Sequence, residues 1–295
     1  MASWEGKSAG TPMGYRLFVF ILKHFGVLPG YFVLRFVAFY FLLFSWKSNR
    51  PLWNYFRDIQ HYGWLKSMYY MFRNYYLFGQ TIVDKVVLMS GIKNPFTFEF
   101  DGESSLRQMA EMGEGGLLLS AHAGNYEIAG HLLKRLETTI NLVMYDGEQE
   151  QIKAYMEKVV GKRNMNLILI KNDLSHIYAI NDAIRKKELV CMHADRFVEG
   201  NKTVTSTFLG KPAPFPLGPF ILATTFKVPV CFVFAFKEST THYHLFASEV
   251  KLYGEGSRDA QQKLMMKDYV EAVEEKVKQY PLQWYNYYDF WKKQV

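Results

Sequence analysis

The sequence predicts an α/β fold, with a mostly parallel central sheet flanked by helices and an N-terminal hydrophobic helical membrane arm. From residue 95 onward, short apolar runs typical of buried strands alternate with helical stretches. Before them lies a segment at 14–45 that is rich in large apolar residues. Aromatic residues make up 17% of the chain and gather at both ends, as they do where rings lie at the headgroup level of a bilayer. We therefore divide the chain into a membrane-associating arm at 1–93 and an α/β domain at 94–295.

The apolar arm is too interrupted to be a straight membrane span. Lys23, Pro29 and Arg35 break its apolar run. The uncharged stretch at 36–45 is far shorter than the roughly 20 residues that a straight helix needs to cross a bilayer. A half-inserted or surface-lying helix fits better, with its cationic side chains reaching lipid phosphates. A buried helical hairpin is the alternative. The aromatic residues of 50–93 are expected to continue the arm and dock it on the core.

The α/β domain is predicted from alternating periodicities. Strand candidates lie at 96–100, 116–121, 140–145, 166–170, 188–193, 228–236 and 243–253. Helices are expected at 104–113, after 122, at 148–162, at 174–187 and at 258–280, the last with Ser257 as its N-cap. Strands that alternate with helices indicate a largely parallel sheet covered on both faces.

Charge and cysteine content restrict the partners and the compartment. The net charge of +7 suggests an anionic neighbour, either anionic lipid, an acidic carrier protein or nucleic acid. Since the basic residues form no long run and no nucleic-acid motif, we expect no nucleic-acid partner. The two cysteines, Cys191 and Cys231, lie in apolar runs and are expected to be buried and inert. Two thiols in a chain of this size favour a reducing compartment.

The sharpest chemical feature is the segment HAGNYE at 122–127, which directly follows an apolar strand candidate. The carboxyl end of a strand that leads into a helix is where α/β sheets place ligands and catalysts. Five residues along a helix turn by about 140°, so His122 and Glu127 cannot share a helix face. They meet only if His122 lies in the turn and Glu127 reaches back from the first helical turns. Gly124 and Asn125 supply the permissive backbone and the cap that this turn needs.

This arrangement suits proton abstraction from an alcohol. The Glu127 carboxylate fixes the tautomer of His122 and leaves the other imidazole nitrogen free as a base. No Ser or Cys nucleophile stands beside His122, so the pattern favours direct attack of a hydroxyl oxygen on a thioester. Amides at the helix start can stabilise the oxyanion. A capping histidine with an incidental glutamate is the alternative, because His-x4-Glu alone is a weak match.

Three ordered blocks of the chain resemble one family. HAGNYE resembles the HX4(D/E) motif of the lysophospholipid acyltransferase superfamily. The block at 193–230, with HADRF and FLGKPAPFPLG, and the closing PLQWYNYYDFW at 281–291 are similar to those of its bacterial lipid A late acyltransferase (lauroyl/myristoyl) branch, in a form like that of Bacteroidetes-type bacteria. The hydrophobic arm resembles that family's membrane anchor, so the similarity covers nearly the whole chain.

The resemblance implies roles for individual residues. His122 and Glu127 match the catalytic pair. Substrate-binding positions are implied at Asn125, Asp195, Arg196, Gly210 and Gly218. Arg196 can hold an acceptor phosphate or carboxylate with its planar guanidinium, and a surface salt bridge with Asp195 or Glu199 is the alternative. Phe208 is interpreted as ordinary loop packing.

The resemblance also implies the reaction and its place. A fatty acyl chain moves from an acyl thioester to a hydroxyl of a lipid acceptor, a lipid A precursor or a related lipid, at the cytoplasmic face of the bacterial inner membrane. No cofactor and no metal are expected. The co-substrate is an acyl carrier protein thioester, favoured because that carrier is acidic and this chain is basic, and acyl-CoA is the other donor.

Basic clusters differ in their expected distance from the site. The cluster at 185–187 precedes the strand candidate 188–193, so it lies at the opposite end of that strand from Asp195. We therefore expect a carrier protein to dock at the region from Lys202 to Lys211 or at 292–293.

Two rival functions remain open. Glu127 and His131 are spaced for one helix face, and His193 and Asp195 follow a strand, so a metal-dependent hydrolase is one. No full ligand signature supports it. The other is an inactive membrane adaptor that keeps the fold. Metal analysis tests the first, and consumption of an acyl thioester tests the second.

Overall fold

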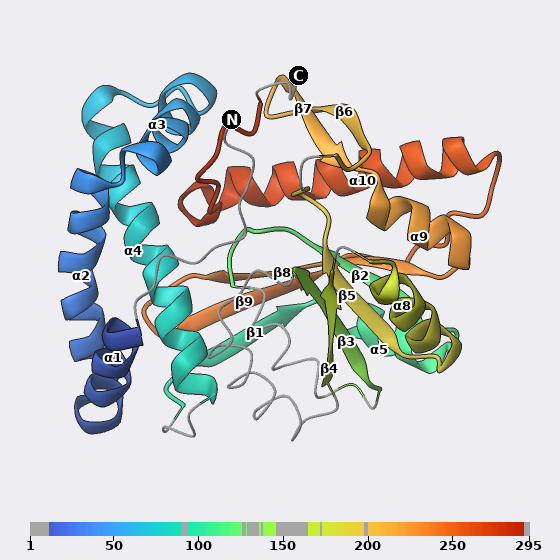
Figure 1. Cartoon of the computed structure of the whole chain (residues 1–295), viewed down its shortest axis with the longest axis horizontal. Helices are drawn as coiled ribbons and strands as arrows, with labels where there is room; N and C mark the ends of the chain where they lie inside the picture. Colours follow the sequence, from blue (N-terminus) through green and yellow to red (C-terminus); the bar gives the residue numbers. More distant parts are fainter. Residues whose placement is uncertain are drawn as a thin grey trace.

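The computed structural model describes residues 12–89, 94–125, 128, 136, 138–145, 165–171, 173–197 and 200–291. Its centre is a seven-stranded sheet in the order β1-β9-β8-β2-β5-β3-β4 (Figure 1). Its strands are β1 (Thr97–Asp101), β2 (Gly116–Ser120), β3 (Ile140–Tyr145), β4 (Met165–Ile170), β5 (Leu189–His193), β8 (Val230–Lys237) and β9 (His242–Ala247). The predicted α/β class is confirmed.

The sheet is mostly parallel, as predicted. Strands β8, β2, β5, β3 and β4 all run in one direction. The exception is at one edge, where β9 pairs antiparallel with β8 and parallel with β1. The strand candidate at 243–253 was too long, because β9 ends at Ala247. Beyond it the chain continues antiparallel alongside the start of β8, where Lys251 and Val230 exchange two backbone hydrogen bonds.

Helices cover both faces of the sheet. They are α5 (Glu103–Glu111), α8 (Ser175–Arg185), α9 (Gly218–Phe226) and α10 (Arg258–Gln279), with a short 3₁₀ turn η3 (Pro281–Gln283) after α10. Successive side chains of a strand point to opposite faces. In β2, Leu117 and Leu119 accordingly pack in the cluster that contains α10 and α8 residues, whereas Leu118 packs with α5. The predicted Ser257 cap is confirmed, since its side chain accepts a hydrogen bond from the Ala260 amide, a contact that contributes about 1 kcal/mol.

Some sequence expectations lie outside the described residues, and others are confirmed. The predicted helix at 148–162 is outside, as is most of the one expected after residue 122. Cys191 and Cys231 are buried. Burial raises the pKa of the Cys191 thiol to about 12 and that of Cys231 to about 11, so both are inert at neutral pH.

A two-stranded hairpin, β6 (Thr203–Phe208) and β7 (Lys211–Pro216), was not predicted. Three prolines in β7 hide its strand character, because proline cannot donate to a ladder. The connection is a two-residue turn in which Leu209 and Gly210 both have positive φ, at 50° and 77°, the geometry of a tight hairpin. Phe208 is fully buried against Trp284 and Phe290, so its interpretation as a packing residue is confirmed.

The N-terminal arm is a set of helices laid against one side of the α/β domain (Figure 1). It comprises α1 (Pro12–Phe25), α2 (Val27–Phe44), α3 (Trp46–Asn54), the π-helical turn η1 (Tyr55–Ile59) and α4 (Trp64–Met89). Helices α1 and α2 are separated by Gly26, which has a φ of 83°. Helix α2 continues through Pro29 and Arg35 without interruption. Pro29 fits because it lies in the first turn, where its missing N–H has no helical partner.

Helix α2 packs on α4 but leaves its outer face uncovered. A Cβ at Gly79 of α4 would lie 2.5 Å from Leu34 Cδ1, so glycine lets the two helices approach closely. By length and composition α2 is long and apolar enough to cross a membrane, and 22% of it is buried inside the protein. The helix is longer than the uncharged stretch counted after Arg35, because it includes the residues on both sides of that arginine. The half-inserted or surface-lying arrangement stays a prediction. The exposure of α2 also disagrees with a buried hairpin.

Candidate active site

His122 lies in a turn directly after the carboxyl end of β2. The turn is held from two sides: the Gly124 amide donates to the Gln283 carbonyl at 2.7 Å, and the Asn125 amide donates to the Ala235 carbonyl at 2.7 Å. Gly124 has φ 70°, and a Cβ there would lie 2.0 Å from the Ala235 oxygen. Only glycine fits this approach, so the glycine in HAGNYE serves the backbone of the turn.

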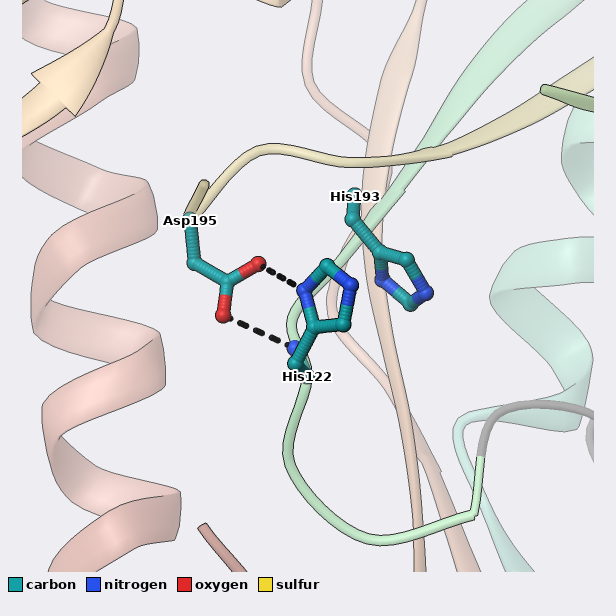
Figure 2. Close-up of side chains that lie close together, drawn as sticks. All are labelled: His122, His193 and Asp195. Carbon is teal, nitrogen blue, oxygen red and sulfur yellow. Dashed lines mark hydrogen bonds and ion pairs between the residues drawn. The ribbon is translucent and has the colours of Figure 1, made fainter. Parts of the chain in front are cut away.

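Asp195 holds His122 with both carboxylate oxygens (Figure 2). Oδ1 lies 2.8 Å from Nδ1 of the imidazole, and Oδ2 accepts the backbone N–H of His122 at 2.8 Å. The two residues meet because β2 and β5 pair in parallel, with Ser120 opposite His193. Their carboxyl ends therefore lie side by side. The carboxylate favours the tautomer that carries its proton on Nδ1 and leaves Nε2 as the basic nitrogen.

The electrostatics of the pair suit a base. Burial disfavours the charged form of Asp195, but the His122 ring, its hydrogen bond and the Arg196 charge outweigh burial and hold the pKa of that carboxyl well below its usual range. Burial and Arg196 lower the pKa of His122, and Asp195 opposes them. The His122 side chain keeps 22% of its surface exposed, against 2% for Asp195. At neutral pH the pair is thus a neutral imidazole on an ionised carboxylate.

His193 is a third member of the site. It ends β5, and its ring centroid lies 4.2 Å from that of His122 at a tilt of 38° (Figure 2). Burial and the neighbouring His122 lower the pKa of His193 well below its ordinary value. Ligand atoms of His122, His193 and Asp195 lie within 4.8 Å of one another, so these three can hold a metal ion. The metal set considered from the sequence joined His193 and Asp195 to Glu127 and His131, which lie outside the described residues.

The predicted His122–Glu127 pair stays a prediction, because Glu127 is outside the described residues. Among the described residues the carboxylate on His122 is that of Asp195, which the sequence had placed in the substrate-binding set. One signal could have found it: a histidine and an aspartate that each follow a buried strand candidate of a parallel sheet.

The remaining predicted residues have distinct surroundings. The Arg196 guanidinium donates to the Tyr285 carbonyl and lies 5.7 Å from the centre of the Tyr288 ring. The Asn125 side chain points into the protein, where it bonds Tyr243. Gly210 forms the hairpin turn, and Gly218 begins α9. Their substrate-binding roles stay predictions.

Comparison with known proteins gives the family. None of the curated proteins matches the chain. A solved structure that is similar is the 1-acyl-sn-glycerophosphate (LPA) acyltransferase PlsC from Thermotoga maritima, with 13% sequence identity and a TM-score of 0.39 over 84% of this chain and 97% of that chain. The family model for bacterial lipid A biosynthesis acyltransferases matches residues 71–293. Since this match spans well over half of the sequence, the chain belongs to the bacterial lipid A biosynthesis acyltransferase family.

Proposed function

We propose that the protein, an acyltransferase by its family, moves a fatty acyl chain from an acyl carrier protein thioester to a hydroxyl of a lipid A precursor or a related lipid. The main observation in support of this proposal is the hydrogen bond between the His122 imidazole and the Asp195 carboxylate at the carboxyl ends of β2 and β5. Such an ordered, neutral imidazole can take a hydroxyl proton without a protein nucleophile beside it.

The steps follow from the two residues. Nε2 of His122 removes the proton of the acceptor hydroxyl while the oxygen attacks the thioester carbonyl. Asp195 stabilises the imidazolium that forms. The tetrahedral intermediate then collapses, the carbon–sulfur bond breaks, and the imidazolium returns its proton to the thiolate of the carrier. The products are an ester on the lipid and a free carrier thiol.

The direct test is transfer by the purified full-length protein in lipid vesicles, followed by mass spectrometry of the lipid. We expect an acceptor heavier by one acyl group and an equal loss of carrier thioester. Running acyl-CoA in parallel identifies the donor. Loss of thioester without acylated lipid would indicate a hydrolase, and no loss with either donor would indicate an inactive adaptor.

The cluster of His122, His193 and Asp195 makes a metal-dependent hydrolase the second candidate. The two functions differ in their need for a metal. Under the acyltransferase proposal, metal analysis of the purified protein finds no stoichiometric zinc or manganese, and a chelator leaves transfer unchanged. Loss of activity with chelator, restored by one metal, would favour the hydrolase.

We propose that the outer face of α2 attaches the protein to the cytoplasmic face of the bacterial inner membrane. Phe32, Phe36 and Phe39 expose 57%, 64% and 53% of their surface there. Changing all three to Gln should move the protein from the membrane fraction to the soluble one, because buried apolar area holds an arm of this kind. Vesicle flotation measures it, and high salt alone should not release the wild type.

A control variant tests whether membrane attachment depends on this face of α2 or on exposed apolar side chains in general. It carries the same change to Gln at three exposed apolar residues of the α/β domain: Leu174, Tyr178 and Leu252. This variant should stay on the membrane. Equal release of both variants, or release of the wild type by salt, would contradict the proposed role of α2.

The acidic carrier is proposed to dock near the β6–β7 hairpin. Lys202 and Lys211 are exposed at its two ends. Lys202→Glu with Lys211→Glu should lower kcat/KM for the carrier-bound donor, and raising salt should do the same to the wild type, because opposite charge speeds association. Arg185→Glu with Lys186→Glu is the matched control, since it changes the net charge equally at the amino end of β5, away from Asp195. Equal losses in both variants would rule out a local docking patch.

A further inference from the structure

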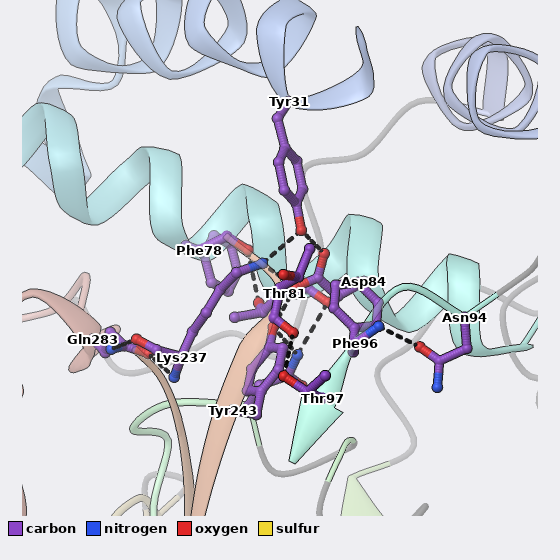
Figure 3. A network of polar contacts seen from close by, with 12 residues as sticks. Tyr31, Phe78, Thr81, Asp84, Asn94, Phe96, Thr97, Lys237, Tyr243 and Gln283 are labelled. Atoms are coloured by element: carbon purple, nitrogen blue, oxygen red, sulfur yellow. Dashed lines mark hydrogen bonds and ion pairs between the residues drawn. The ribbon is translucent and has the colours of Figure 1, made fainter. Parts of the chain in front are cut away.

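A buried polar cluster joins the N-terminal arm to the sheet (Figure 3). Asp84 of α4 forms an ion pair with Lys237 of β8, with Nζ 2.5 Å from Oδ2. Tyr31 of α2 donates to one carboxylate oxygen of Asp84, and Tyr243 of β9 donates to the other. All four side chains are buried, with Asp84 and Tyr243 fully so. Side chains from α2, β8 and β9 therefore converge on one carboxylate of α4.

Stability alone does not explain this cluster. Removing two charges from water is costly, and a buried ion pair is often no more stabilising than apolar side chains of the same size. Apolar side chains pack around the two tyrosines of this cluster, among them Val83, Val87 and Leu245. A polar network in such surroundings fixes the relative position of its members, because each hydrogen bond has a narrow geometry.

One branch of the network reaches the turn that carries His122. The Tyr243 hydroxyl oxygen accepts a hydrogen bond from the Asn125 side chain at 3.3 Å. Asn125 is also held by its backbone on the Ala235 carbonyl, on the same strand as Lys237. The backbone of Lys237 exchanges two hydrogen bonds with the Gln283 side chain, at 2.9 and 2.8 Å. The backbone carbonyl of Gln283 in turn accepts a hydrogen bond from the backbone amide of Gly124.

We infer that Asp84 and Lys237 are positioning residues that act through Tyr243 and Asn125 to hold the His122 turn in place against Asp195. This inference rests on the proposed role of His122. It assigns Asn125 to the support of the turn, and it makes the active site complete only when the arm is docked on the sheet.

The two tyrosines provide a matched pair of variants. Each donates one hydrogen bond to Asp84 and accepts another, Tyr31 from Lys237 and Tyr243 from Asn125. Tyr243→Phe should lower kcat about 10- to 100-fold, the cost of a small misplacement of a reacting group, with KM for the donor nearly unchanged. Tyr31→Phe should keep wild-type kcat. Both should lower the unfolding temperature by similar amounts, since each loses two hydrogen bonds, one of them to the same buried carboxylate. Equal kcat values for the two variants would overturn the inference.

A second comparison distinguishes support of the turn from contact with substrate. Asn125→Leu cannot donate to Tyr243, so it should match Tyr243→Phe in kcat, and the double variant should lose no more than either single one. If Asn125 contacts substrate, Asn125→Leu instead raises KM, and its effect multiplies with that of Tyr243→Phe. That result would overturn the inference.

Hydrogen exchange gives a readout that needs no substrate. In the full-length protein on vesicles, the amides of Gly124 and Asn125 should exchange faster in Tyr243→Phe than in the wild type, and Tyr31→Phe should leave them unchanged. Unchanged exchange in Tyr243→Phe would contradict the inference even if no acyl transfer were detected. Conversely, if the His122→Ala variant were active, His122 would not be the base, but the exchange result would be unaffected. Failure of the proposed function and failure of this inference are therefore distinguishable.

Discussion

His122→Ala is expected to lower the rate of acyl transfer by about 10²–10⁴-fold, the typical contribution of a general base. The fold should survive, because the backbone bonds of the turn do not involve the imidazole. Single-turnover transfer from the carrier thioester measures the rate, and thermal unfolding monitors the fold. His176→Ala, a half-buried histidine of α8, is the control and should be fully active. Activity within a few-fold of the wild type would remove His122 from the mechanism.

The pH profile of the wild type gives an independent measure of the same base. His122 acts in its neutral form, so kcat/KM falls as pH drops through its pKa. Burial and the charge of Arg196 lower that pKa, which places the acid limb below the ordinary histidine value of about 6.5. An acid limb above that value would contradict a neutral imidazole at neutral pH.

Asp195→Asn is the second large effect, with an expected loss in kcat of about 10²–10⁴-fold, because an amide in place of the carboxylate favours the wrong imidazole tautomer and no longer stabilises the imidazolium. The acid limb should also move to lower pH. The carboxylate raises the pKa of His122, so its removal lowers that pKa further. Measuring kcat across pH separates this from a loss of substrate affinity.

Glu127→Gln is the comparison for Asp195→Asn. Both replace a carboxylate by an amide of the same shape. If Asp195 orients His122, Glu127→Gln costs less than Asp195→Asn and leaves the acid limb closer to that of the wild type. The reverse order would make Glu127 the orienting carboxylate and return Asp195 to the substrate-binding set.

Much of the fold could be predicted because its signals are local. Buried strands of a parallel sheet are continuous apolar runs, which is how β2, β5 and β8 could be located. The Ser257 cap depends only on the residues of the first turn of α10. The turn at His122 is marked locally by Gly124, whose close approach to Ala235 leaves no room for a side chain. Each of these signals depends on a few neighbouring residues. The fold class, most elements and the place of the candidate base could therefore be predicted from the sequence.

The contacts of the site depended on tertiary structure, because they join residues far apart in the chain. His122 and Asp195 are separated by 73 positions, and only the register of β2 against β5 makes that aspartate the partner. Asp84 and Lys237 are separated by 153 positions, and neither residue carries a local signal. The hairpin β6–β7 was hidden by its prolines. Local sequence patterns indicate where chemistry can occur. The pairing of strands and the docking of the arm bring particular side chains within hydrogen-bonding distance there, and sequence separation gives no measure of that distance.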